Sequence, residues 1–518
     1  MTPKRIILIL LTGLAVAKLL FSLLFSVNQP QVQSRLQLYQ TNLILQAAEL
    51  QVEGESDPLP LQYLLGENPY SQAQEQYEQA SGEIHRNFEQ LESQLKTLLE
   101  TDSGAGDPQL LVTDNPSTDA QPRLQNALGE MTRLQAEIGL NKGILQAKQE
   151  QVKAAQDTWE EVMLIHPGSH WEATARVLMG LWSAAPLIAP DGESLIQSHL
   201  QGWFRDESLS QLYQVQGNSS ALAALVTQRQ QAAEQALLRL ILIGGIPFLG
   251  GILGVVILVG LILGLILHKE RSLLAGTQNA LWETPWDGEI IWQVLIVGFF
   301  FISQILLPEF LPLIVQGIGL DPLSFDLRGK AFYVLTSYVL MMVGGLGVLY
   351  LSLKPFFPLP DGWFKVKWLS NWPLWGVGGY FAAIPLVVVI SLVNQQIWQG
   401  QGGSNPIISL ALQSQDTLAL LIFFSTASLA APLFEEIIFR GFFLPSLTRY
   451  IPVWGAITLS SLVFAIAHLN ISEVLPLTVL GMVLGFVYVR SRNLLASICL
   501  HSLWNSGTLL SLFLLGNS

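Results

Sequence analysis

Residues 240–267 read LILIGGIPFLGGILGVVILVGLILGLIL, an apolar stretch without an ionisable side chain. A helix needs about 20 apolar residues to cross the hydrocarbon core of a bilayer, so this stretch is long enough to span it. The composition of the whole chain agrees: half of its 518 residues are hydrophobic and 13% are charged, whereas soluble domains carry about 25% charged residues. The sequence therefore predicts an integral membrane protein.

Eight further apolar runs flank this stretch. The first, residues 6–26, follows Lys4 and Arg5 and contains Lys18, whose long stem can reach the membrane surface. No small-residue cleavage site ends this run, which favours an uncleaved anchor over a signal peptide. The other runs cover residues 291–315, 332–353, 375–393, 417–433, 453–468, 474–489 and 494–515. We expect an all-α, multi-span helical membrane bundle with nine spans.

Residues 27–237 form a long polar region with a helical pattern. Gln, Glu and Leu dominate residues 71–100 and 123–162, where apolar residues recur three and four positions apart. Residues 101–122 contain Asp, Gly, Ser and Pro and are expected to form a linker. The pattern predicts a coiled-coil-like helical hairpin. A domain that binds substrate or a partner is the alternative, although no particular residue supports it.

Charge is distributed unevenly along the chain. Residues 27–237 hold 11 basic and 27 acidic residues, a net charge of −16, and the remainder has a net charge of +3. This acidic excess argues against nucleic-acid binding. Cys499 is the only cysteine, which excludes an intrachain disulfide and a cysteine-cluster metal site. His166 and His170 lie in the sequence IHPGSH, which is more typical of a loop than of a metal site.

The basic residues between the apolar runs predict a topology. Cytoplasmic loops of membrane proteins are enriched in Lys and Arg. With a cytoplasmic N-terminus, residues 27–237 would be extracytoplasmic, and most of the basic loop residues would share the cytoplasmic side. These residues are Lys269, Arg271, Lys354, Lys365, Lys367, Arg440, Arg449, Arg490 and Arg492.

Ionisable side chains interrupt the apolar runs of the last 110 or so residues, where charge is expensive and a functional role is the first hypothesis. Glu436 and Arg440 are four residues apart and would form an ion pair on one helical face. Glu435 is rotated about 100° away and is left without that partner, which suits a general base. The alternative is that both glutamates pair with Arg440 and only hold helices together.

Two more polar clusters follow on later predicted helices. His468 ends the run that contains Phe464, and in isolation it is more typical of a satisfied core histidine. His501 and Asn505 are four residues apart and share a helical face. Both can donate hydrogen bonds to an oxyanion, although polar contacts between membrane helices are the simpler interpretation of this pair.

Taken in order, the clusters read E-E-x-x-x-R, F-x-x-x-H and H-x-x-x-N. This ordered set resembles the CAAX-protease and bacteriocin-processing family, over roughly residues 410–515. The resemblance implies a helical membrane bundle in which Glu435 and His468 activate water. It further implies that His501 and Asn505 stabilise the oxyanion, while Glu436 and Arg440 support the site.

A catalytic metal is the main alternative for the chemistry, because Glu and His can ligate zinc. The sequence lacks H-E-x-x-H and has no Cys or Asp ligand near the motifs, so we expect no metal and no other cofactor. The predicted organisation is an anchor at residues 1–26, an acidic helical extramembrane region at 27–237, transmembrane helices at 238–400 and a CAAX-protease-like core at 401–518.

The predicted function is an intramembrane endopeptidase that hydrolyses a peptide bond near the membrane. Its partners would be a peptide or protein substrate and the lipid bilayer, with a further protein partner at residues 27–237 as a conjecture. A non-catalytic membrane scaffold or binding protein with the same polar cavity is the alternative. A transporter is disfavoured because no internal repeat is apparent.

Overall fold

The computed structural model describes residues 2–27, 29, 33–50, 65–103, 117–404 and 416–516. Within these ranges the regular elements are all helices and no strand occurs, so the all-α prediction is confirmed. The chain forms two compact units. Residues 1–32 and 242–517 make up one, here called the membrane unit, and residues 33–241 make up the other, here called the polar unit.

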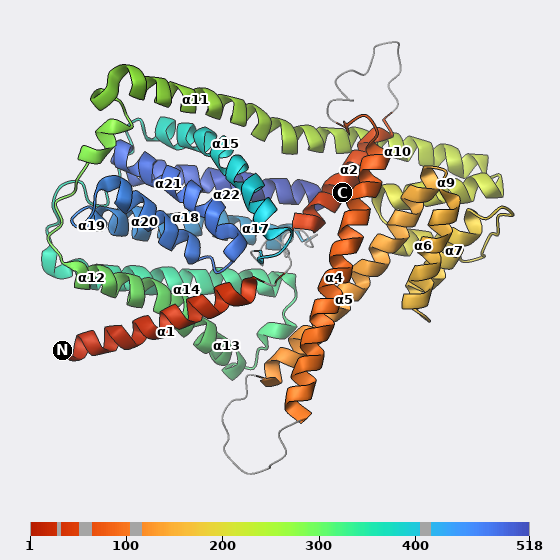
Figure 1. Ribbon diagram of the computed structural model, residues 1–518, viewed down its shortest axis with the longest axis horizontal. Coiled ribbons are helices and arrows are strands. Elements are labelled where there is room, and N and C mark those ends of the chain that lie inside the picture. Colours follow the sequence, from red (N-terminus) through yellow and green to blue (C-terminus); the bar gives the residue numbers. More distant parts are fainter. Residues whose placement is uncertain are drawn as a thin grey trace. The chain divides into compact units, whose positions relative to one another are not determined.

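The polar unit is built from helices that share one apolar core. Its elements are α2 (Gln33–Ala48), α4 (Pro69–Ser103), α5 (Ser117–Lys148), α6 (Val152–Ile165), α7 (His170–Leu181), α8 (Gly192–His199), α9 (Gly202–Gln216) and α10 (Ser219–Leu240). The long helices α4 and α5 pack side by side (Figure 1). The helical character predicted for this region is confirmed.

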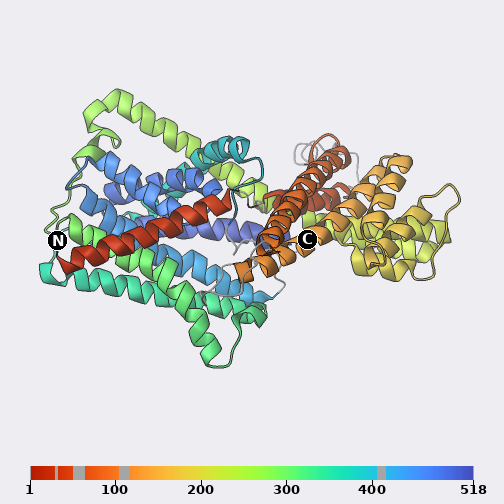
Figure 2. The ribbon, with the colours of Figure 1, turned by 60° about the horizontal axis from the view of Figure 1, so that its bottom comes forward.

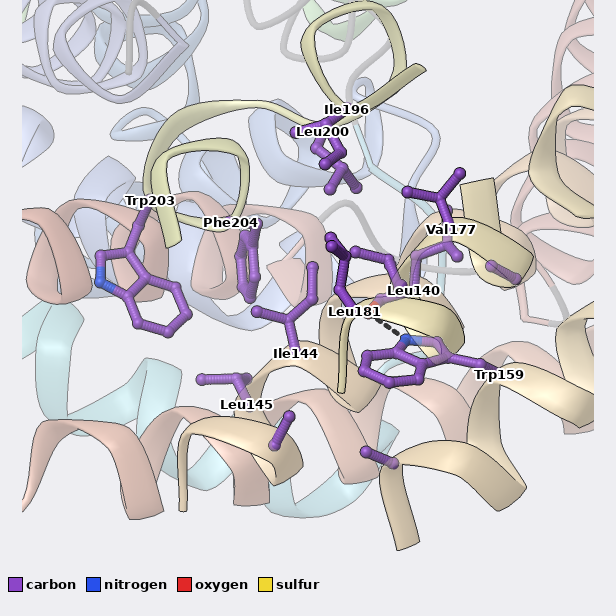
Figure 3. Packing of buried hydrophobic residues seen from close by; sticks show 14 of the residues in the cluster. Leu140, Ile144, Leu145, Trp159, Val177, Leu181, Ile196, Leu200, Trp203 and Phe204 are labelled. Carbon is purple, nitrogen blue, oxygen red and sulfur yellow. Dashed lines mark hydrogen bonds between the residues drawn. The ribbon is translucent and has the colours of Figure 1, made fainter. Parts of the chain in front are cut away.

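Trp159 lies at the centre of this core. Its side chain is fully buried, and its indole N–H donates a hydrogen bond of 3.2 Å to the carbonyl of Leu140 (Figure 3). A Cβ atom at Gly143 would lie 2.2 Å from the indole nitrogen, so only glycine allows α5 to approach α6 this closely. The core is thus organised around one large aromatic residue and one missing side chain.

One boundary in this region differs from the prediction. The stretch 123–162 was expected to be continuous, but α5 ends at Lys148 and α6 begins at Val152. Glu150, between them, has a φ of 63°, which interrupts a helix. The predicted linker is shorter than expected at both ends, since α4 continues to Ser103 and α5 begins at Ser117; residues 104–116 lie outside the described part of the chain.

The membrane unit combines the N-terminal helix with the helices after residue 242. The elements η4, η7 and η8 within it are π-helical, and a further π-helix, η1 (Ile241–Gly245), lies at the boundary between the two units. The unit contains α1 (Pro3–Ser26), α11 (Ile246–His268), α12 (Gly288–Gln293), η4 (Val294–Leu306), α13 (Leu307–Gly317), α14 (Leu327–Leu353), α15 (Trp372–Trp398), α17 (Thr417–Ser425), η7 (Thr426–Ala430), α18 (Ala431–Glu436), η8 (Ile437–Phe443), α19 (Leu444–Leu447), α20 (Val453–Ile466), α21 (Val474–Ser491) and α22 (Leu494–Gly516). Helix α1 packs along η4 (Figures 1 and 2).

Eight helices among the described residues are long and apolar enough to cross a membrane, which supports a multi-pass integral membrane protein. The ninth predicted span, residues 453–468, is shorter than the others. Its helix α20 has 14 residues and is therefore about 21 Å long, less than the roughly 30 Å of a hydrocarbon core.

Basic residues from separate loops gather at one end of the membrane unit. Lys4 and Arg5 form ion pairs with Glu289 at 3.0 and 2.8 Å. Arg449 donates to the backbone carbonyl of Trp286, three residues before Glu289. Lys4, Arg5 and Arg449, which were predicted to lie on the same side of the membrane, therefore contact the same segment, residues 286–289. The orientation of this end relative to a membrane stays a prediction.

The opposite end of α1 contacts the loop after α20. The backbone N–H of Ile471 donates to the Ser26 hydroxyl oxygen over 3.1 Å. Since Arg449, just before α20, lies at the other end of the unit, the chain passes from one end to the other through α20. This short helix therefore connects the two ends even though its regular part is shorter than predicted.

Candidate active site

The first motif lies where two kinds of helix meet. Glu435 and Glu436 end α18, and the π-helix η8 begins at the next residue. π-Helical turns inside α-helices are rare and occur frequently at functional sites. The surrounding side chains Phe434, Ile438 and Phe439 are fully buried, so this segment carries its two carboxylates through the apolar core of the membrane unit.

Glu436, Arg440 and His501 form a buried network. One carboxylate oxygen of Glu436, Oε1, lies 2.8 Å from Arg440 and 2.9 Å from the Nδ1 of His501. Glu436 and Arg440 are both completely inaccessible to solvent. The predicted ion pair is confirmed, and His501 is its additional partner from α22. A carboxylate can only accept hydrogen bonds, so Nδ1 of His501 carries a proton.

Arg440 is held from two further directions. It donates to the carbonyl of Gly481 on α21 over 3.2 Å, and its guanidinium carbon lies 4.5 Å from the centre of the Phe464 ring. These contacts offset part of the cost of a buried charge. Arg440 was expected among the basic residues on the cytoplasmic side. Its side chain is instead buried within the bundle, on the π-helix η8 and not in a loop, and the side of the membrane stays a prediction.

Glu435 has different partners from its neighbour. Its Oε1 accepts a hydrogen bond of 2.6 Å from the hydroxyl of Tyr338 on α14, and its Oε2 lies 3.9 Å from the Nε2 of His501. In the described structure it makes no hydrogen bond or ion pair with Arg440. The arrangement in which both glutamates pair with Arg440 is therefore not observed, and Glu435 keeps one oxygen facing an imidazole.

Tyr338 is a site residue that the sequence motifs did not indicate. It lies in an apolar helix about 100 residues before Glu435, and no local pattern connects the two. The only available signal was a hydroxyl group in the middle of a predicted span. Polar atoms at such positions need a partner within the protein, but the sequence does not say which one.

His468 is oriented by its own helix. Its Nδ1 lies 2.9 Å from the carbonyl oxygen of Phe464, one turn earlier. Because a carbonyl only accepts, Nδ1 carries the proton and Nε2 keeps its lone pair. The Phe464 ring packs edge-on against both histidines, with centroid distances of 4.9 Å to His468 and 5.7 Å to His501.

The predicted pair of Glu435 and His468 is not joined directly. Among the described residues, neither a hydrogen bond nor an ion pair connects them, although Phe464 packs against His468 and against His501, which faces Glu435.

Asn505 donates to the carbonyl of Ala427 in η7 over 2.7 Å. The structure thus brings together Glu435, Glu436, Arg440 and His501 by direct contacts.

Metal binding was considered for the same residues. In the described part of the chain, no group of three or more His, Cys, Asp or Glu side chains is placed as metal ligands would be. The expectation of a metal-independent site stays a prediction. Of the two histidines in IHPGSH, His166 is the C-cap residue of α6 and His170 stacks on His199 at 4.5 Å.

Comparisons with known proteins agree with the motifs. Residues 417–507 match the family described as type II CAAX prenyl endopeptidase Rce1-like. The chain is 26% identical over 133 residues to YdiL of Bacillus subtilis strain 168, which is named as a membrane peptidase. This alignment covers 26% of the chain and 53% of YdiL, so the chain spans about half the length of that relative.

A second relative covers more of the membrane unit. The chain is 27% identical over 224 residues to MroQ of Staphylococcus aureus strain USA300, which is named as a membrane-embedded CAAX protease. The alignment covers 42% of this chain and 87% of MroQ. No solved structure matches the chain. The family resemblance read from the three motifs is confirmed for the C-terminal part.

Proposed function

We propose that this protein is a membrane-embedded endopeptidase, because residues 417–507 match the family described as type II CAAX prenyl endopeptidase Rce1-like and two membrane peptidases are similar to the chain. The observation that carries the proposal is the position of His501. Its two ring nitrogens face the two adjacent carboxylates, at 2.9 Å from Glu436 and 3.9 Å from Glu435. One carboxylate thus orients the imidazole, and the other remains available for chemistry.

In the proposed mechanism, Glu435 takes one proton of the attacking water while the water oxygen adds to the carbonyl carbon, and His468 accepts a hydrogen bond from the other proton. When the C–N bond breaks, Glu435 returns its proton to the leaving amine nitrogen. Tyr338 occupies Oε1 of Glu435, so Oε2 is the oxygen that would act as base. Nδ1 of His468 donates its hydrogen bond to the carbonyl of Phe464, so the Nε2 lone pair is free to accept a hydrogen bond from the water. A general base of this kind contributes roughly 10²–10⁴-fold to a rate.

His501 and Asn505 are proposed to stabilise the oxyanion. Because Nδ1 of His501 faces Glu436, a hydrogen bond from Nε2 to the oxyanion requires a ring that carries protons on both nitrogens, and we propose that this form of His501 takes part in the reaction. Such a ring donates through Nδ1 to Glu436 and through Nε2 toward the substrate oxygen. Asn505 would have to exchange its bond to Ala427 for one to the substrate, or donate through its second N–H.

The substrate class follows from the position of the site. Glu435, His501 and Asn505 lie on helices that are long and apolar enough to cross a membrane, and His468 follows the shorter apolar helix α20. We therefore propose a peptide bond of a membrane protein or membrane-bound peptide as the target. Cleavage of prenylated CAAX substrates is one form of this activity, suggested by the names of the matched family and of MroQ.

Two substitutions test the mechanism. Full-length protein in liposomes is incubated with internally quenched peptides drawn from membrane-protein sequences. We expect Glu435→Gln and His468→Ala to lower cleavage by roughly 10²–10⁴-fold, with unchanged expression. Glu309→Gln, at an exposed carboxylate on α13, is the matched control and should keep full activity.

Full activity in both active-site variants would contradict the mechanism. Absence of cleavage by the wild-type protein across the peptide set would instead favour the alternative, a membrane scaffold that uses the same polar network for binding. One structural observation fits this alternative: the side-chain amide of Asn505 already donates to the carbonyl of Ala427 and is not directed only at a substrate.

A further inference from the structure

We propose that the end of α1 and the turn after α15 form a clasp that positions His468. The clasp consists of Ser26, Gln29, Asn394, the pair Gly402–Gly403 and Ser472. It holds the loop that directly follows His468, at the end of the membrane unit opposite the basic residues. The inference rests on the proposed function, because it assigns a positioning role for the same histidine.

The backbone next to His468 is in an unusual conformation. Leu469 has a φ of 64°, in the left-handed region that non-glycine residues seldom occupy. Such conformations persist only where the surrounding structure fixes them, and they cluster at functional sites. Asn470, the next residue, donates from its side chain back to the carbonyl of His468 over 3.3 Å. The Phe464 carbonyl orients the ring of His468, and we infer that the backbone position of this residue depends on how the following loop is held.

The end of α1 holds the loop directly. Ser26 is 2% exposed, and its hydroxyl oxygen accepts the backbone N–H of Ile471 at 3.1 Å while its proton is donated to Leu23. The carbonyl of Gln29 accepts the N–H groups of Gly402 and Gly403, each at 2.9 Å. Residues from the N-terminal helix thus contact both the loop and the turn that supports it.

The turn after α15 requires its two glycines. Gly402 and Gly403 have φ values of 106° and 76°. A Cβ atom on Gly402 would lie 2.7 Å from the Cβ of Ser472, and one on Gly403 would lie 2.9 Å from Asn470. Only glycine satisfies both the conformation and the close approach. The turn is therefore shaped to lie against the His468 loop.

Ser472 and Asn394 complete the clasp with buried hydrogen bonds. Ser472 is buried, donates its hydroxyl to the carbonyl of Gly403 at 2.8 Å and donates its N–H to Gly402. Its own carbonyl accepts the side-chain amide of the buried Asn394 at 2.7 Å. Two segments that are far from the loop in sequence, residues 26–29 and 394–403, are therefore joined to it by hydrogen bonds.

The test uses the full-length protein with Ser26→Ala and Asn394→Leu. Diethylpyrocarbonate, which modifies accessible imidazoles, reports on His468 by mass spectrometry, with His85, whose side chain is 66% exposed, as the internal reference. We expect His468 to react several times faster in both variants. In the cleavage assay, kcat should fall about tenfold with KM nearly unchanged, as expected for a misplaced catalytic group. Ser26→Thr keeps the hydroxyl and should behave like the wild type.

Thr12→Val is the matched control on α1. It removes the hydroxyl that accepts the indole N–H of Trp292 at 2.7 Å, away from the clasp. His468 reactivity that is unchanged in Ser26→Ala and Asn394→Leu, or raised equally by Thr12→Val, overturns the proposal. Faster modification with unchanged kcat also overturns it. If the wild type cleaves no peptide, the proposed function fails, while the reactivity of His468 still decides whether the clasp holds it.

Discussion

Tyr338 is the only described hydrogen-bond donor to Glu435, and it lies outside the matched residues 417–507. Its hydroxyl is 2.6 Å from Oε1, so it restricts the rotation of the carboxylate. We predict that Tyr338→Phe lowers kcat by roughly tenfold with little change in KM, because the base is no longer held in one orientation. Steady-state cleavage kinetics provide the measurement.

Tyr333→Phe is the control for this prediction, since it removes a phenol from the same helix without touching Glu435. Wild-type kinetics for Tyr338→Phe would show that Glu435 is oriented by other contacts. A rise in KM without a change in kcat would instead place Tyr338 in substrate binding.

Glu436 has a structural role that its neighbour Glu435 lacks. Substitution by glutamine would leave the fully buried guanidinium of Arg440 without its counter-ion. Removing one partner of a buried pair costs roughly 3–5 kcal/mol. We predict that Glu436→Gln lowers the melting temperature of the protein in detergent far more than Glu435→Gln does. Equal melting temperatures for the two variants would refute this division of roles.

Sequence reasoning reached the local part of this site and not the rest. The pair of Glu436 and Arg440 follows from a spacing of four residues on one helix, which fixes which side chains meet. The contacts of Tyr338 with Glu435 and of His501 with Glu436 join residues 97 and 65 positions apart. Those contacts depend on how the helices pack against one another, and the periodicity of apolar residues in the sequence does not specify that packing.

Helices α11 and α15 illustrate packing through small residues. A Cβ atom at Gly254 would lie 2.0 Å from the carbonyl oxygen of Phe381, and one at Gly250 would lie 2.9 Å from Ile384. This G-x-x-x-G spacing brings two membrane helices into close contact. We predict that Gly254→Leu destabilises the membrane unit by at least about 1–3 kcal/mol, the usual cost of overpacking.

Gly264→Leu tests whether this effect is specific to the contact. Gly264 lies on the same helix, and a Cβ atom there would meet no other atom within 4 Å. Thermal unfolding in detergent should therefore distinguish the two variants. Similar melting temperatures would mean that the contact between α11 and α15 is dispensable.

At the same scale, helix boundaries were harder to predict than helix existence. Long apolar runs without charge predicted spans correctly because burial in lipid leaves few alternatives. The break at Glu150 and the short α20 were missed. The first is caused by the positive φ of Glu150, and the second by the end of α20 at Ile466. Neither position is indicated in the sequence by a proline or a glycine.

For the molecule as a whole, we expect the two units to differ in their response to pH, because among the described residues only the polar unit contains a buried histidine outside the membrane spans. His166 is 7% exposed, and its Nε2 has no hydrogen-bond partner among the described residues. Burial lowers the pKa of His166 below its ordinary value of 6.5. The pKa of His170 is lowered as well, by burial and then by the neighbouring His199.

A lowered histidine pKa means that the unfolded polar unit binds more protons than the folded one. Stability is therefore complete above about pH 6.5 and declines as the pH falls from there toward the folded pKa, by at most about 1.4 kcal/mol per pH unit for one proton. We predict that amide hydrogen exchange in α6 and α7 accelerates between pH 7 and pH 5, relative to the intrinsic rates, while the helices of the membrane unit stay protected.

His166→Phe should remove much of this acid sensitivity, because it replaces the unpartnered nitrogen by an apolar ring of similar size. His170 leaves a smaller residual effect, since this residue is less buried than His166. His85→Gln is the matched control: His85 is exposed on α4, 66% in its side chain, and its loss should leave the pH profile of exchange unchanged. An identical profile for wild type and His166→Phe would show that acid acts on the polar unit through its carboxylates instead.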